Sequence, residues 1–116
     1  IDKHIYYKNK KKILICTKMV KTLVIRKSTK EGKKLMAIFT KPNGRTKITH
    51  FGEAGADDYT LTKDKERRRL YRERHKKDLA TNDPTRAGYL SYYILWGDST
   101  SRQNNIKAYK KRFGFN

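Results

Sequence analysis

The sequence has a single cysteine, Cys16, and only two prolines among its 116 residues. One cysteine excludes an internal disulfide and a zinc site built from several cysteines, and it is typical of a reducing compartment. No run of about 18 apolar residues is present, so no membrane insertion is expected. The first 18 residues contain lysines and one short apolar run, which is not the pattern of a signal peptide.

Acidic residues are also scarce. The chain has 11 Asp and Glu against 30 Lys and Arg, which gives a formal net charge of +19. Residues 1–18 contain 6 basic and 1 acidic residue, residues 19–62 and 63–80 each contain 9 and 4, and residues 81–116 contain 6 and 2. The positive charge is therefore spread along the whole chain and is not confined to one tail. Because such charge repels itself in a compact fold, its even spread indicates an anionic neighbour.

The apolar content, 35%, is low for a globular chain, whereas 11% aromatic residues with eight tyrosines argue against disorder. A single small α+β domain over residues 19–116 is therefore expected. Residues 1–18 begin without methionine and are rich in Ile, Lys, Asn and Tyr. We expect them to be an extension upstream of a native start at Met19; the alternative is a flexible basic arm.

Three short segments are rich in β-branched residues or alternate between polar and apolar: 19–27, 33–41 and 45–51. The last two are joined by KPNGR, residues 41–45, in which Pro42 and Asn43-Gly44 suit a tight hairpin turn. The pattern predicts a three-stranded antiparallel β-meander with Val24, Ile38 and Ile48 facing the core. Such a sheet needs helices on one face to bury enough surface.

Three α-helices are predicted after the sheet. The first follows an N-cap at Thr62 and runs to about Lys77. The second has its N-cap at Asp83, with Pro84 at the first helical position, and ends near Gly97. The third starts at the capping box Thr100–Gln103 and ends at Gly114. The expected fold class is therefore α+β, a three-stranded antiparallel β-meander followed by three α-helices.

The first predicted helix carries a basic stripe. Its members are spaced by three and four positions and share one side: Lys65, Arg68, Arg69, Arg72 and Lys76. Local ion pairs on a solvated helix are one explanation. However, residues 63–80 hold nine bases and four acids, so cations remain for phosphates or carboxylates.

A second group of cations lies on the third predicted helix, beside its apolar face: Lys107, Lys110 and Lys111. Together with the stripe, these lysines are predicted to bind nucleic acid or an acidic partner. The middle helix instead has aromatic residues at i, i+3, i+4 and i+7: Tyr89, Tyr92, Tyr93 and Trp96. Such a stripe is typical of a core or a protein interface, and the alternative is stacking on unpaired bases.

No motif indicates an enzyme. The glycines of FGEAGADDY, residues 51–59, lack the following Gly-Lys-Ser/Thr of a phosphate-binding loop. Asp57-Asp58 is expected to stabilise a turn or to hold the basic helix, rather than to bind a metal. The three histidines have no ligand spacing, and Cys16 with a distant histidine is a weak nucleophile. We expect no catalysis, metal, cofactor or small-molecule substrate.

A set of separated residues resembles a family of small uncharacterised basic proteins of nucleocytoplasmic large DNA viruses, the giant viruses of algae and protists. The resemblance spans roughly residues 46–114. It is carried by Phe51-Gly52, Gly55, Asp58-Tyr59-Thr60, Lys63-Asp64, Glu66-Arg67, Tyr71, Arg74-His75, Asp83-Pro84, Ala87-Gly88, Leu95-Trp96 and Arg112-Phe113-Gly114. It implies a viral setting and no particular chemistry.

Charge and resemblance together predict a non-enzymatic virion structural protein. It is expected to be a minor capsid or core-associated component that contacts acidic surfaces of other virion or capsid proteins. The alternative is a protein that binds DNA without sequence preference, with the basic stripe following the phosphates. The expected location is the virion, and the host cytoplasm or nucleus during assembly.

Overall fold

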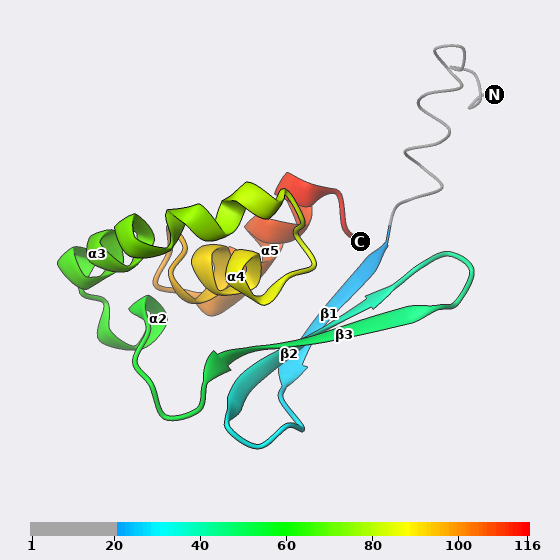
Figure 1. Ribbon diagram of the computed structural model, residues 1–116, viewed down its shortest axis with the longest axis horizontal. Helices are drawn as coiled ribbons and strands as arrows, with labels where there is room; N and C mark the ends of the chain where they lie inside the picture. The colour runs from blue at the N-terminus through cyan, green and yellow to red at the C-terminus, as the bar shows by residue number, and fades with distance from the viewer. Residues whose placement is uncertain (1–20) are drawn as a thin grey trace, which may run out of the picture.

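The computed structural model describes residues 21–116, and the predicted extension 1–18 with Met19 lies outside them. The first half of the described chain is an antiparallel sheet in the order β1-β2-β3. Its strands are β1 (Thr22–Lys27), β2 (Lys33–Thr40) and β3 (Thr46–Glu53). Helices follow and lie on one side of the sheet (Figure 1). The predicted α+β meander is confirmed.

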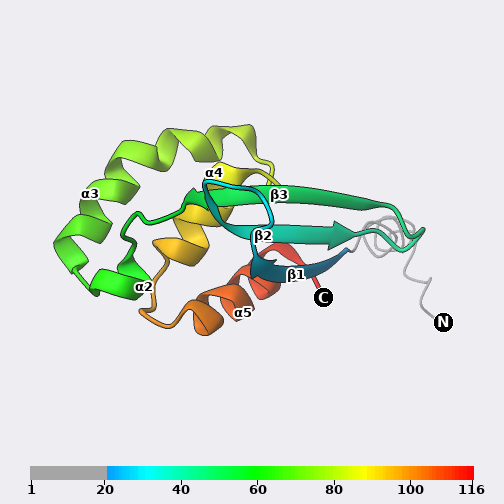
Figure 2. The ribbon, with the colours of Figure 1, turned by 90° about the horizontal axis from the view of Figure 1, so that it is seen from below.

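The turn between β2 and β3 forms as its residues predict. Lys41 N donates to Arg45 O at 2.8 Å, and Gly44 N donates to Lys41 O at 2.9 Å. Gly44 has a φ of 91°, a conformation that costs glycine little. Asn43 Oδ1 also accepts from Arg45 N at 2.9 Å. The hairpin extends beyond the helical layer (Figure 2).

The predicted core face of the sheet is wrong. Val24, Ile38 and Ile48 do form one row across the strands, since Val24 pairs with Ile38 and Ile38 pairs with Ile48. That row points away from the helices, and Val24 is 37% and Ile48 51% exposed. The buried side chains are those of the opposite parity: Leu23, Leu35, Ala37, Phe39 and Phe51. Both faces carry apolar residues, and the bulkier phenylalanines decide which one the helices cover.

The helical layer consists of six short elements. They are α2 (Tyr59–Thr62), α3 (Lys65–His75), the 3-10 helix η1 (Lys76–Thr81), α4 (Ala87–Leu90), the π-helix η2 (Ser91–Leu95) and α5 (Arg102–Phe113). All three predicted helix starts differ from those in the structure.

The first predicted helix is two helices, and Thr62 is not its N-cap. Asp58 caps α2, and Asp64 caps α3 by accepting from Glu66 N at 3.0 Å and Arg67 N at 3.1 Å. Between the two helices the chain reverses at Lys63, which has a φ of 58°. An aspartate can accept two backbone N–H groups at a helix start, which explains why it displaces threonine as the cap.

Asp83 and Pro84 form a turn instead of a helix start. Asp83 Oδ1 accepts from Thr85 N at 3.0 Å and from its hydroxyl at 2.6 Å, so the carboxylate is used locally. α4 therefore begins only at Ala87 and continues as η2, which ends before Gly97.

The third helix starts one residue later than predicted. Ser101, not Thr100, is the N-cap and accepts from Asn104 N at 3.2 Å. The predicted end is confirmed, because Gly114 has a φ of 74° and donates its N–H to Lys110 O.

The C-terminal residue pairs with the start of the sheet. Asn116 N donates to Lys21 O, and Leu23 N donates to Asn116 O, both at 2.8 Å. The ring of Phe115 lies 5.2 Å from that of Phe39, centroid to centroid. These contacts bring the end of α5 next to β1, as Figure 1 shows.

Candidate polyanion-binding surface

Two of the three arginines in the predicted stripe, Arg68 and Arg72, bind backbone carbonyls of the same chain. Arg68 Nε donates to Gly97 O at 2.7 Å. Arg72 Nη1 donates to Trp96 O at 2.8 Å and to Tyr92 O at 3.2 Å, with its guanidinium 4.1 Å from the Tyr92 ring centre. Because the carbonyls at a helix C-terminus carry partial negative charge, these arginines hold α3 against the end of η2.

The other three residues of the stripe lie at the surface. Arg69 pairs with Glu66 at 2.6 Å and Lys76 with Glu73 at 3.6 Å, while Lys65 is exposed. The structure therefore does not bring the five cations together as one phosphate-facing stripe. The local ion pairs considered from the sequence account for two of them.

The lysines of α5 have a different environment. Lys107 and Lys111 are exposed and Lys110 is half-buried. No Asp or Glu occurs in residues 99–116, and none of these lysines pairs with a carboxylate in the described part of the chain. They remain available to an anion.

The aromatic stripe lies in the core. Tyr89, Tyr92 and Trp96 are buried, and Trp96 stacks on Tyr71 with ring centres 4.5 Å apart. Tyr93 is half-buried. These rings are packed against protein, which leaves them unsuited to stacking on unpaired bases.

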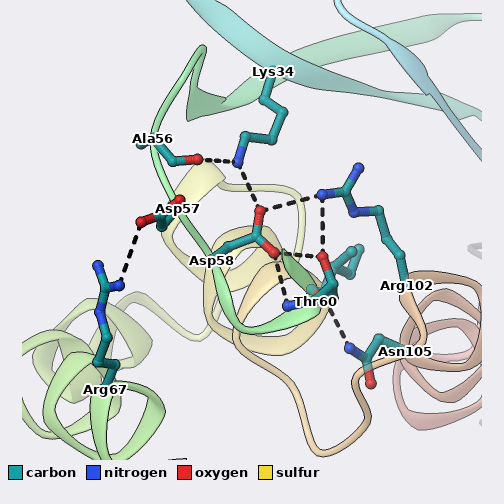
Figure 3. A network of polar contacts seen from close by, with 9 residues as sticks. Lys34, Ala56, Asp57, Asp58, Thr60, Arg67, Arg102 and Asn105 are labelled. Carbon is teal, nitrogen blue, oxygen red and sulfur yellow. Dashed lines mark hydrogen bonds and ion pairs between the residues drawn. The ribbon is translucent and has the colours of Figure 1, made fainter. Parts of the chain in front are cut away.

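The two adjacent aspartates bind cations of the same chain (Figure 3). Asp58 is 1% exposed and accepts from Lys34 Nζ at 2.6 Å, from Arg102 Nη2 at 3.2 Å and from the Thr60 hydroxyl. Asp57 pairs with an arginine of α3, Arg67, at 3.3 Å. The predicted turn and the predicted hold on the basic helix are both confirmed.

Asp58 remains charged despite its burial. Burial alone raises the pKa of its carboxyl, but hydrogen bonds from Lys34 and Thr60 and the charges of Lys34 and Arg102 outweigh it. The net effect is a pKa below the ordinary value. The site connects β2, α2 and α5. Both of its cations, Lys34 and Arg102, pair with Asp58.

Four cations from the start of β1, the β2–β3 loop and β3 meet at a cavity near the β2–β3 loop. This cavity, of about 430 Å³, is lined by four basic residues, Lys21, Lys41, Arg45 and Lys47, together with Phe39, Thr46, Asp83 and Thr85. We call it the hairpin cavity. No carboxylate of the described residues lies within ion-pair distance of these four cations.

Local structure explains how these cations come together. The turn hydrogen bonds place Lys41 and Arg45 opposite each other where the strands enter the hairpin loop. Lys47 is directed towards the cavity by Thr85, whose buried hydroxyl accepts from Lys47 Nζ at 2.8 Å. Lys21 enters from the adjacent edge of the sheet, where it is bound to Asn116.

The one carboxylate of the cavity, Asp83, is already engaged. Hydrogen bonds from the Thr85 hydroxyl and N–H lower its pKa, with smaller effects from Lys47 and Arg86. Its second oxygen lies 3.7 Å from Arg86 Nε. Four cations face one carboxylate that has its own partners, so the cavity has an excess of positive charge that a phosphate group would offset.

The α5 lysines lie at the same end of the molecule. Phe39 lines the hairpin cavity and contacts Phe115, and Lys21 pairs with Asn116, so the last turn of α5 leads directly to it. Lys110 and Lys111 lie in that turn.

The four cations of the hairpin cavity were not predicted as a site, because they are spread over residues 21–47 and share no helical or motif spacing. One signal was present: residues 32–52 contain five Lys and Arg and no Asp or Glu. The predicted KPNGR turn also implies that Lys41 and Arg45 are neighbours across the hairpin.

A second cavity, of about 470 Å³, lies between the sheet and α3 and includes Tyr71, His75, Asp78, Ser91 and Trp96 in its lining. His75 Nδ1 is 3.1 Å from Asp78 Oδ2, and its ring stacks on Tyr71. Burial raises the pKa of Tyr71, although a hydrogen bond with Ser91 opposes the rise. Its polar groups pair with one another.

Residues 21–116 contain no group of three or more His, Cys, Asp or Glu side chains that could hold a metal ion. Within the same residues, no helix has the length and apolarity needed to cross a bilayer.

Comparison with known proteins places the chain in a family. Residues 23–75, from β1 to the end of α3, match the Family of unknown function (DUF5754). Uncharacterized protein L851 of Acanthamoeba polyphaga mimivirus is 36% identical over 80 residues, which cover 64% of this chain and 80% of that protein. No solved structure matches the chain. The resemblance noted from the sequence is confirmed, and the chain belongs to this family of giant-virus proteins, for which no function is known.

Proposed function

We propose that the protein binds the phosphate backbone of nucleic acid, without catalysis and without sequence preference, through the hairpin cavity and the adjoining end of α5. The observation that carries the proposal is the convergence of Lys21, Lys41, Arg45 and Lys47 on one cavity whose only carboxylate is already engaged. Phosphate contacts of this kind supply most of the affinity of non-specific nucleic-acid binding.

The surroundings of the cavity favour nucleic acid over protein as the partner here. The lining consists of lysine, arginine and threonine side chains and one aspartate, Asp83, and Phe39, its one large apolar residue, is 1% exposed. Protein interfaces have an apolar centre, whereas nucleic-acid interfaces are polar and strongly positive. A virion setting, in which a genome is packaged, is compatible with this role.

The test is duplex DNA binding measured by fluorescence anisotropy at several salt concentrations. The variant K41A/R45A/K47A removes two lysines and one arginine from the hairpin cavity. The control K65A/R74A/K77A removes the same charges from exposed positions of α3 and η1. We expect the salt slope of the first variant to fall by about 2 to 3, at roughly 0.9 per lost phosphate contact, with a much smaller change in the control.

Two results would contradict the proposal. Equal losses in the two variants would show that net charge, and not this surface, determines binding. The absence of wild-type binding at about 0.15 M salt would remove nucleic acid as the partner. Circular dichroism of each variant checks that the fold is retained.

A further inference from the structure

The sheet has a face that no described element covers, and we call it the outer face. Strand pairing sets its residues in three rows: Thr22–Thr40–Thr46, Val24–Ile38–Ile48 and Arg26–Met36–His50. Figure 2 shows the helices on the opposite side of the strands. The central row is entirely aliphatic, and its two outer members are more than one-third exposed.

The outer face and the hairpin cavity lie on opposite sides of β3, because residues alternate along a strand, and Thr46 at the end of the strand borders both. Lys47 and Thr49 point towards the helices, where both bind Thr85. Ile48 and His50 therefore point to the other side. A partner on the outer face would leave the hairpin cavity accessible.

The chemistry of the outer face does not suit nucleic acid. Proteins that bind bases on an open sheet present aromatic rings for stacking. None of the nine residues in the three rows is a phenylalanine, tyrosine or tryptophan, and the one imidazole, His50, lies within hydrogen-bond distance of Ser28, at 2.8 Å. Aligned aliphatic side chains gain most by packing against apolar atoms of another protein.

Charge decides what kind of protein fits. The face itself carries Arg26, and strands β1 and β2 contain no Asp or Glu. A second copy of the chain would bring a net charge of +19 against another +19, which disfavours self-association. We propose that the outer face binds an acidic protein surface with an apolar centre, and that the protein can thereby join such a partner to nucleic acid.

The docking proposal can be tested with a defined probe. The probe is a synthetic helical peptide with one leucine stripe flanked by glutamates, and the control peptide has the same composition in scrambled order. We expect the first peptide to shift the NMR methyl signals of Val24, Ile38 and Ile48, and the scrambled peptide to leave them in place. This result would show that the face needs an apolar centre as well as acidic charge.

Variants distinguish binding at the outer face from non-specific attraction between opposite charges. Val24→Thr with Ile48→Thr keeps β-branched residues in the strands and removes apolar surface. We expect it to weaken binding of the peptide at least about tenfold, while Leu70→Gln on α3, which changes another exposed hydrophobic residue, has little effect. Duplex DNA binding should be the same in all three proteins.

Several outcomes would overturn the docking proposal. Equal binding of the scrambled peptide, or an equal loss in the Leu70 variant, would leave only charge attraction. Methyl shifts that depend on protein concentration would assign the face to a second copy, and shifts caused by duplex DNA would assign it to nucleic acid. Each result leaves the proposed role of the hairpin cavity untouched, because that role is tested with the cavity variants.

Discussion

At the scale of single residues, Asp58 is the most deeply buried acidic residue in the described part of the chain. It is almost fully buried and contacts Lys34 of β2 and Arg102 of α5, so one carboxylate connects the sheet with the last helix. Removing one partner from a buried charged group leaves the others without compensation, which is far more costly than losing a surface ion pair.

Asp58→Asn keeps a side chain that can cap α2 but removes the charge. We expect it to lower the free energy of unfolding by about 3 kcal/mol at neutral pH. Asp57→Asn, whose carboxylate is half exposed beside Arg67, should cost less than about 1 kcal/mol. Urea denaturation of the two variants provides the comparison, and equal losses would contradict the assigned role of Asp58.

The same substitution should alter the pH dependence. The folded-state pKa of Asp58 is below its ordinary value, so the unfolded chain takes up a proton first as the pH falls. Its stabilisation is complete above about pH 4 and is lost as the pH falls through the folded-state pKa. The difference in stability between wild type and Asp58→Asn should therefore shrink below about pH 4. A constant difference would show that the carboxyl has the same pKa in the folded and the unfolded chain.

Both aspartates illustrate what the sequence can show about single residues. The pair Asp57-Asp58 was correctly assigned to a turn and to binding the basic helix, because aspartates favour turns and because cations are abundant nearby. The identity of Lys34 and Arg102 as partners was not predictable, since they lie 24 and 44 residues away.

At the scale of elements, the junction between α3 and η2 depends on arginine geometry. Arg72 donates to the carbonyl of Tyr92 in η2 and to that of Trp96 directly after it, and its guanidinium lies over the Tyr92 ring. A lysine could supply the charge but not two donors in one plane over an aromatic ring.

We expect Arg72→Ala to lower the free energy of unfolding by about 2 kcal/mol and Arg72→Lys by roughly half as much. Arg74→Ala, at an exposed position on the same helix, should change it by less than about 0.5 kcal/mol. Thermal denaturation measures all three. If Arg72→Ala and Arg74→Ala behaved alike, the inward assignment of Arg72 would be wrong.

The elements also show where sequence patterns stop being informative. The three strands and the KPNGR turn were predicted because alternation and turn chemistry are local. The face of the sheet that the helices cover could not be predicted, because Val24, Ile38 and Ile48 form as regular a row as their neighbours of opposite parity. Helix starts were misplaced where an aspartate or serine close to the predicted cap had better access to backbone N–H groups.

The candidate site was the least predictable feature. Its four cations belong to the edge of β1, the hairpin and β3, and a tertiary contact with Thr85 orients one of them. The basic stripe on α3, which the sequence favoured, is partly used to hold the fold. Spacing shows which residues share a helix side but not whether that side meets solvent.

At the scale of the whole molecule, the excess of cations should be visible in stability. Self-repulsion among like charges weakens the folded state, and it is reduced by salt and by bound anions. We expect the melting temperature to rise by several degrees between about 0.01 and 0.15 M sodium chloride, and further with sodium phosphate at equal ionic strength.

Differential scanning fluorimetry can make this comparison, and K41A/R45A/K47A provides the control. If the hairpin cavity binds phosphate, the additional effect of phosphate over chloride should be absent from this variant. A melting temperature that falls with added salt would show that ion pairs outweigh self-repulsion in this fold.

The pairing of Asn116 with Lys21 and Leu23 has a consequence for aggregation. β1 is an outermost strand, and such strands can recruit a strand from another molecule. The backbone of the last residue already occupies the beginning of that margin, and Arg26 and Lys27 place charge on the remainder. The pairing of Asn116 with the start of β1 therefore hinders another molecule from adding a strand along this edge.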